Sequence, residues 1–170
     1  FMPIATKGAV KTLSSEDLEN LGAEIILSNP YHLMLRPGLP ALEKLGGLHT
    51  LAGWDRALLT DSGGYQVFSL PNKTTEDGVA FKSPIDGSTH FLTPELSMQM
   101  QTAIDSDIFM QFDDVAAGDS SRERYEEAME RSLRWAKRSK DEFCRLKPGR
   151  MLFGIVQGGV HEDLRQKSAK

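Results

Sequence analysis

Short apolar runs alternate along this chain with longer amphipathic stretches. Four of these runs have the length and the nearly continuous apolar character of buried strands, namely residues 24–28, 57–60, 107–112 and 151–156. Such strands are typical of parallel sheets, because helices cover both faces of the sheet. The pattern therefore predicts a parallel sheet built from these four segments.

Signals for helix starts fall between the strands. Asp17 follows a serine at the spacing of a capping box, and Pro94 occupies a first helical position. Apolar residues at helical spacing lead from residue 121 toward Cys144, and Pro148-Gly149 ends that stretch. We expect helices to begin at Ser14, Thr93, Ser120 or Ser121, and His161.

Residues 66–70 and 78–82 interrupt this alternation and indicate a β-hairpin inserted into the strand–helix pattern. Parallel strands followed by helices leave two α/β architectures open, a doubly wound sheet and a (β/α)₈ TIM barrel. A barrel needs about 250 residues, so residues 1–170 would form its first part. We expect a piece of a longer protein, because the chain starts at Phe1 and ends within a helical pattern.

Composition narrows the class of protein. The chain has 20 Lys and Arg against 24 Asp and Glu, a net charge of −4, and 39% hydrophobic residues. These values predict a soluble globular protein and exclude binding of nucleic acid by bulk charge alone. No apolar run approaches the roughly 18 residues of a membrane span. A single cysteine, Cys144, fits a reducing, cytoplasmic location and leaves no strong zinc motif.

The densest chemical signal follows the second strand, in Asp61-Ser62-Gly63-Gly64-Tyr65. Catalytic groups of α/β enzymes lie at the carboxyl ends of strands. Glycines let backbone N–H groups approach a ligand closely, and Tyr65 offers a flat face on which a base can stack. The alternative is an ordinary turn, which uses the same residue types.

Two further strand ends repeat this chemistry. Asp113 and Asp114 follow the third strand and would point to opposite sides if the strand continues. A carboxylate there can accept two hydrogen bonds from one edge of a purine. The alternative is that these acids lie in the first turn of the next helix, where negative charge is favourable. Gln157 and Gly158 follow the fourth strand. Gln157 could bind a ligand through its side-chain amide while Gly158 lets that ligand approach the backbone closely, or the two residues could form a tight turn. Together the three ends predict a purine pocket on one rim.

A basic run occupies the expected helix after residue 121. Its cations could contact phosphates, but a solvated face balanced by the glutamates at 123, 126, 127 and 130 is the simpler interpretation. The run consists of Arg131, Arg134, Lys137, Arg138 and Lys140.

At these positions the sequence resembles the tRNA-guanine transglycosylase family, also called queuine tRNA-ribosyltransferases. The motifs that carry the resemblance include GAEIILSNPYHLMLRPG, LLTDSGGYQVFSL, FKSPIDGSTHFLTPE, SDIFMQFDDV and LFGIVQGG, and they follow the family's order along nearly the whole chain. The resemblance implies a (β/α)₈ barrel with a zinc-binding insertion, and a pentosyltransferase of queuosine biosynthesis. Such an enzyme exchanges guanine at the wobble position of GUN-anticodon tRNAs for a 7-deazaguanine through a covalent ribosyl-enzyme intermediate.

The resemblance also implies roles for individual residues. Asp61 matches the family's proton acceptor, and Ser62, Gly63, Gly64 and Tyr65 match its base-binding loop. Asp113 matches the purine-recognising carboxylate, and Gln157 with the adjacent Gly158 matches the base-binding Gln motif. The nucleophilic Asp and the ligands of the structural Zn²⁺ are expected after Lys170, so the 170 residues alone should be inactive. The family forms dimers, so a homodimer or a family heterodimer is expected.

Two departures from the family pattern bear on the substrate. Val115 follows the Asp pair where bacterial members usually have Cys, which leaves open whether the incoming base is aminomethyl-deazaguanine or queuine. Asn29-Pro30 replaces the usual Asn-Thr. Three other functions stay open at this point: a non-catalytic partner subunit of the same family, an archaeal-type or DNA-modifying relative, and an α/β domain with ordinary strand-end turns.

Overall fold

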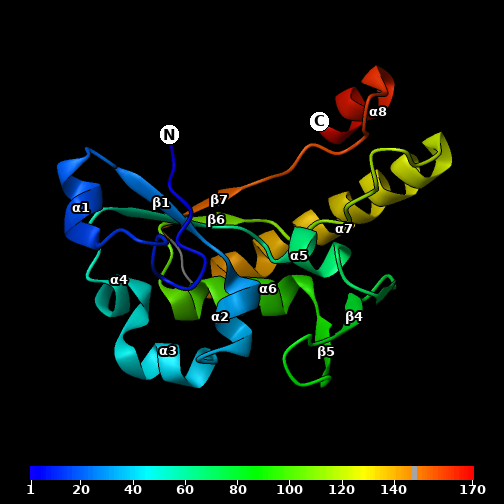
Figure 1. Cartoon of the computed structure of the whole chain (residues 1–170). Helices are drawn as coiled ribbons and strands as arrows, with labels where there is room; N and C mark the ends of the chain where they lie inside the picture. The colour runs from blue at the N-terminus through cyan, green and yellow to red at the C-terminus, as the bar shows by residue number, and fades with distance from the viewer. Residues whose placement is uncertain (147–148) are drawn as a thin grey trace.

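Figure 1 shows the computed structural model of the chain, which describes residues 1–146 and 149–170. Its central sheet has four parallel strands in the order β1-β2-β6-β7. Their bounds are Ile25–Ser28 for β1, Ala57–Thr60 for β2, Ile108–Met110 for β6 and Met151–Phe153 for β7. Each strand lies within a predicted segment, so the parallel sheet is confirmed. The strand order follows the chain without the reversal of a doubly wound sheet, which is consistent with part of a TIM-barrel-like domain.

The register of the strands brings their carboxyl ends to one edge of the sheet. β1 and β2 pair from residues 25 and 57 to residues 28 and 60. β6 and β7 pair from residues 108 and 151 to residues 110 and 153, and the backbone N–H of Gln111 donates to the carbonyl of Phe153 at 3.0 Å. Asp61, Asp113 and Gln157 all follow these ends. The parallel pairing of the strands therefore explains why their carboxyl ends lie at the same edge, as predicted.

Four helices begin where the sequence predicts. They are α1 (Ser15–Asn20), α6 (Pro94–Ile104), α7 (Arg122–Leu146) and α8 (Glu162–Ser168). The capping box at α1 is present, because Ser14 and Asp17 bond each other's backbone and side chain. The hydroxyl of Thr93 caps α6 by accepting from the backbone N–H of Leu96 at 3.1 Å. The predicted helix end at Pro148 lies outside the described residues.

Three short helices that the sequence did not reveal connect β1 to β2. They are α2 (Pro30–Leu35), α3 (Leu39–Leu45) and α4 (Gly47–Ala52). Gly46 ends α3 in the left-handed region, with φ +77°, and α4 follows at once. A Cβ at Gly47 would lie 2.6 Å from the Cβ of Asp105, so glycine is required for this turn to pack against the end of α6.

The predicted β-hairpin is wrong in its first strand. Residues 66–70 are not extended, because Gly63 in the left-handed region (φ +82°) starts the short helix α5 (Gly64–Phe68). The inserted sheet lies later and has three antiparallel strands, β3 (Asn72–Thr74), β4 (Val79–Lys82) and β5 (Thr89–Leu92). Only β4 matches a predicted strand. We refer to β3–β5 as the insertion sheet.

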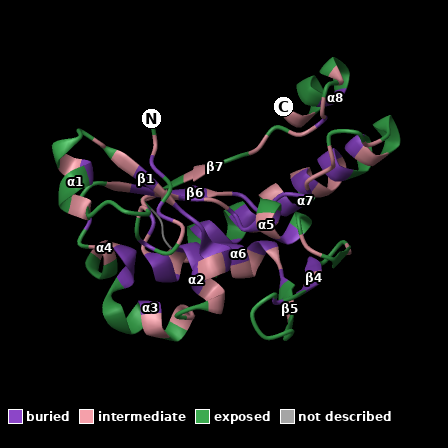
Figure 2. Ribbon diagram, in the orientation of Figure 1, coloured by how far each residue is buried: buried purple, intermediate pink, exposed green. Residues whose placement is uncertain are grey.

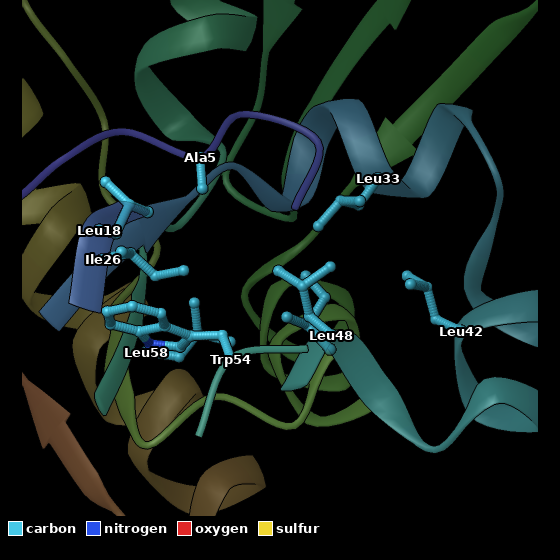
Figure 3. Packing of buried hydrophobic residues seen from close by; sticks show 9 residues of the cluster. Ala5, Leu18, Ile26, Leu33, Leu42, Leu48, Trp54 and Leu58 are labelled. Atoms are coloured by element: carbon cyan, nitrogen blue, oxygen red, sulfur yellow. The ribbon is translucent and has the colours of Figure 1, made fainter. Parts of the chain in front are cut away.

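Buried residues follow β1, β2 and β6 of the central sheet and the inner faces of the helices, whereas β7 has no buried residue and α8 is mostly exposed (Figure 2). One cluster of the hydrophobic core joins β1 and β2 to α1–α4 and α6, and Figure 3 shows its side chains around Trp54, which is 1% exposed. A second cluster joins the insertion sheet to α7, where the rings of Phe112 and Trp135 stack with centroids 4.9 Å apart. The insertion sheet is thereby fixed against the strand end that carries Asp113.

The longest helix, α7, is strongly charged. The sequence suggested a solvated face balanced by the glutamates at 123, 126, 127 and 130, and of these Glu127 does bind Arg131. Arg134 binds Glu76 and Arg138 binds Glu95, both outside α7, whereas Arg131 binds Asp114 and also Glu127. Across the described residues, no helix is both long and apolar enough to cross a membrane.

Candidate functional site

A cavity of about 150 Å³ lies beside the end of β6. A cavity of roughly this volume accommodates a small aromatic ring in an engineered protein. Its walls come from four places: α5, the insertion sheet, the segment that follows β6, and the start of α7. The lining residues are Gly64, Phe68, Asn72, Thr74, Val79, Phe112, Asp113, Asp114, Val115 and Arg124.

Asp113 is the buried carboxylate of this cavity, with 7% of its surface exposed. Its Oδ2 accepts a hydrogen bond from Nε2 of Gln157 at 2.6 Å, and its Oδ1 accepts one from the hydroxyl of Ser62 at 3.3 Å. Burial raises the pKa of Asp113 to about 6, although both hydrogen bonds oppose the shift. The group is therefore ionised at neutral pH and is bound only by neutral donors, which a ligand can replace.

Asp61 lies one residue beyond β2 and is held by three donors. The backbone N–H of Gly63 donates to its Oδ1 at 2.8 Å, and Nε2 of Gln66 donates to its Oδ2 at 3.0 Å. Asn29 also donates to Oδ2 through its side-chain amide. Burial raises the pKa of Asp61 above its ordinary value, with these hydrogen bonds opposing the shift. A carboxylate with a raised pKa is suited to exchanging a proton with a ligand.

The loop between Asp61 and α5 approaches Asp113 closely. The backbone N–H of Gly64 donates to the hydroxyl of Ser62 at 3.2 Å, and that hydroxyl bonds Asp113 in turn. A Cβ at Gly64 would lie 3.0 Å from both the carbonyl oxygen and Oδ1 of Asp113. A Cβ at this position would be tight and would need Asp113 to give by a few tenths of an ångström, so glycine favours close packing of this loop against Asp113.

Tyr65 is 68% exposed and does not line the cavity. Its ring lies 6.4 Å from the ring of Phe68, which does line it. The phenol ring is therefore available on the surface next to the cavity mouth rather than inside the cavity.

Gln157 bonds Asp113 directly, but Gly158 serves the packing of α8. Gly158 has φ +115°, and a Cβ there would lie 2.8 Å from the backbone nitrogen of Arg165. A Cβ at the next residue, Gly159, would lie 2.6 Å from the ring of Tyr125 on α7. These contacts explain in structural terms why both positions are occupied by glycine. The close approach of a ligand to Gly158 stays a prediction.

The neighbouring Asp114 points the other way, into α7. It is 5% exposed, and its two oxygens bind the guanidinium groups of Arg124 (2.6 and 2.9 Å) and Arg131. Its backbone N–H donates to the hydroxyl of Ser132 at 2.9 Å. The prediction of opposite sides assumed a continued strand, whereas β6 ends at Met110, and what the structure shows is that the two carboxylates have different partners. Asp114 has a cationic environment that Asp113 lacks.

The structure thus brings part of the predicted set together. Asp113, Ser62, Gly64 and Gln157 form one connected group, whereas Asp61 is joined to it only through the loop. Sequence reasoning missed the residues that wall the cavity from elsewhere, namely Asn72 and Thr74 of β3, Val79 of β4 and Arg124 of α7. No local signal marks them, because they reach the site through tertiary contacts.

In residues 1–146 and 149–170, no three His, Cys, Asp or Glu side chains lie together in a way that could hold a metal ion. The donor set needed for a structural zinc ion is therefore not formed by these residues.

Comparison with known proteins identifies the family. The family model described as queuine tRNA-ribosyltransferase matches residues 1–170. A queuine tRNA-ribosyltransferase of Neisseria meningitidis serogroup A is 53% identical over 172 residues, which cover 100% of this chain and 46% of that protein. Those of Thermotoga neapolitana and Azoarcus sp. are 55% and 52% identical, each over 99% of this chain and 46% of the relative. The chain thus spans about half the length of these curated relatives, and it belongs to the queuine tRNA-ribosyltransferase family.

Proposed function

We propose that the protein containing this chain is a tRNA-guanine transglycosylase. It replaces guanine at the wobble position of GUN-anticodon tRNAs with a 7-deazaguanine base, as a pentosyltransferase of queuosine biosynthesis. Family membership over the whole chain supports the reaction class. The partners in this proposal are the tRNA and the free base.

The observation that carries the proposal is the environment of Asp113. A guanine edge presents two adjacent N–H donors, and an ionised carboxylate accepts both. Asp113 is buried, ionised at neutral pH, bound only by Ser62 and Gln157, and placed in the wall of a ring-sized cavity. A purine without these donors would leave the carboxylate unsatisfied, which provides discrimination.

The chemistry needs two further carboxylates. In the first step a nucleophilic Asp attacks C1′ of the ribose, the N-glycosidic bond breaks, and guanine leaves with a proton. In the second step the incoming base loses a proton and attacks C1′, which releases the carboxylate. We assign the proton transfers to Asp61, whose raised pKa suits the task. We place the nucleophile in the part of the relatives that this chain does not span.

The wobble base has to leave its stack to reach this cavity. Tyr65, exposed beside the cavity mouth, offers a stacking face for the displaced base or its neighbour. Gly63, Gly64 and Gly158 complete the proposed base-binding loops. Val115 lines the cavity directly beside the Asp pair. In this proposal its side chain contributes to the choice between aminomethyl-deazaguanine and queuine.

The proposal extends to the complete protein. The four parallel strands would be the first part of a closed (β/α)₈ barrel, and residues 1–170 the first part of the transglycosylase domain. The structural Zn²⁺ ion and its ligands would belong to the other part of the relatives' length. A cytoplasmic dimer, either a homodimer or a family heterodimer, completes the expectation.

An exchange assay tests the proposed function. Full-length protein is incubated with GUN-anticodon tRNA and labelled guanine, then with aminomethyl-deazaguanine and queuine as competitors. Incorporation of guanine into tRNA and its replacement by one of the two competitors supports the proposal. Incorporation only into DNA or into another tRNA position favours the archaeal-type or DNA-modifying alternative. Lack of incorporation without a second family subunit, with incorporation on adding it, favours the partner-subunit alternative.

A further inference from the structure

The outer face of the insertion sheet carries a small group of residues that the site does not use. In antiparallel strands, paired residues share a face and successive residues alternate. Residues 72, 81 and 90 pair across the sheet, and Phe81 is buried against the core. The opposite face therefore carries residues 73, 80 and 91 in one row and residues 82 and 89 in the next.

This outer face combines positive charge with an exposed aromatic ring. Lys73 and Lys82 are exposed, and Phe91 is 45% exposed. A shallow hollow of about 410 Å³ lies over the sheet, and Lys73, Lys82 and Thr89 are among its lining residues. Cations beside an accessible aromatic ring are the pattern by which sheets bind single-stranded nucleic acid.

The two lysines are free, in contrast to the arginines of α7. Arg124, Arg131, Arg134 and Arg138 all bind carboxylates, so their charge is already neutralised. Within the described part of the chain, neither lysine of the outer face forms a salt bridge or a side-chain hydrogen bond. The three arginines of the basic run are therefore less available for phosphate contacts than these two lysines.

The acidic residues of the insertion do not lie on this outer face. Residues 71–92 contain Glu76, Asp77 and Asp86, and all three lie in the turns between strands. Glu76 is bound by Arg134 on α7. Asp86 accepts from the hydroxyl of Ser88 at 2.7 Å. The strand faces themselves thus present positive charge to an approaching polyanion.

The same strands connect this face with the cavity. Asn72 and Thr74 of β3 and Val79 of β4 line the cavity beside Asp113, and Lys73 lies between the two β3 residues on the other face. β3 therefore borders the cavity with one face and carries Lys73 on the other, so the cavity and the outer face share one strand.

We propose that the outer face of the insertion sheet binds the phosphate backbone of the nucleic acid whose base occupies the cavity. Lys73 and Lys82 contact phosphates, and Phe91 provides a stacking surface beside them. The proposal rests on the proposed function and adds a contact surface to it.

Salt-dependent binding tests this surface. Affinity of full-length protein for a GUN-anticodon tRNA is measured from about 50 to 200 mM salt, a range over which phosphate contacts weaken strongly. The double variant Lys73→Gln/Lys82→Gln is compared with the wild type and with Lys44→Gln, which removes an exposed cation on α3. We expect about a tenfold loss of tRNA affinity at low salt and a salt slope smaller by about one to two in the double variant only.

Binding of free guanine separates the possible failures. Unchanged guanine affinity in the double variant shows that the cavity is intact. A loss of tRNA affinity in that variant then supports phosphate binding by the outer face of the insertion sheet. If the double variant keeps the wild-type tRNA affinity and salt slope and exchanges guanine normally, the proposal that the outer face binds phosphates is wrong. The proposed function is unaffected by that result. Absence of exchange in the wild type, with and without a second family subunit, would overturn both.

Discussion

Asp113 and Asp114 are consecutive in the sequence and both buried, but their side chains bind different partners. Asp113 faces the cavity and is bound by a hydroxyl and an amide, both neutral. Asp114 faces α7 and is bound by two guanidinium groups, those of Arg124 and Arg131. Two adjacent residues thus differ in their partners. Asp113 is bound by donors that a ligand can replace, and Asp114 belongs to an ion cluster.

Under the proposed function, this difference separates a ligand-binding role for Asp113 from a structural role for Asp114. A carboxylate paired with two arginines has little to gain from a ligand, because its charge and lone pairs are already satisfied. A buried carboxylate without a cation keeps a raised pKa and a strong demand for donors. Asp114 therefore fixes the strand end against α7, and this anchoring holds Asp113 at the cavity.

The largest expected effect comes from Asp113→Asn. The amide keeps one acceptor oxygen but replaces the other with an NH₂ group, so one N–H donor of guanine would lose its acceptor and face another donor. We expect kcat/KM for guanine exchange by full-length protein to fall by about 100- to 1,000-fold, with the protein still folded. Exchange within about threefold of wild type would show that Asp113 does not read the base.

The matching change, Asp114→Asn, should act on stability. It leaves the guanidinium groups of Arg124 and Arg131 without their shared carboxylate in a largely buried site. We expect the free energy of unfolding to fall by about 2–3 kcal/mol, measured by urea denaturation. Guanine affinity of the folded fraction should change less than in Asp113→Asn. The opposite ranking of the two variants would reverse the assigned roles.

The raised pKa of Asp113 predicts a pH dependence of stability. Its pKa is about 6 in the folded state against an ordinary value of 3.8. Between these values the folded state binds more protons than the unfolded state, so this group's contribution to stability decreases as the pH rises from 4 to 7. Asp113→Asn should remove that slope, which is worth on the order of 2 kcal/mol. Parallel pH–stability curves for the two proteins would contradict the raised pKa.

The smallest expected effect is a difference in stability between variants of two arginines that lie one helical turn apart on α7. Arg131 is 12% exposed and binds Asp114 and Glu127, whereas Arg134 is 51% exposed and binds Glu76 on the surface. We expect Arg131→Met to lower the free energy of unfolding by about 1–2 kcal/mol and Arg134→Met by less than about 1 kcal/mol. A thermal or urea denaturation series on the two single variants measures the difference.

Much of the frame of the site could be predicted from the sequence. Apolar runs identified all four parallel strands, and carboxyl-end geometry correctly placed Asp113 near Gln157. These are local or topological rules, and they need no knowledge of which helix packs where.

The parts that failed depend on tertiary contacts. Residues 66–70 show the apolar and polar mixture of a strand, but Gly63 in the left-handed region starts a helix there and moves the sheet to residue 72. The partners of Asp114 are 10 and 17 residues further along the chain, on α7. Nothing in the spacing of charges distinguishes such a pairing from contacts along the helix itself.

The central claim is that Asp113 reads the edge of a purine base, and a structure of full-length protein with bound guanine tests it most directly. We predict the two edge N–H groups of guanine within hydrogen-bond distance of the Asp113 carboxylate, with Asp114 still bound by Arg124 and Arg131. Guanine bound elsewhere, with Asp113 keeping only its contacts to Ser62 and Gln157, would contradict the account.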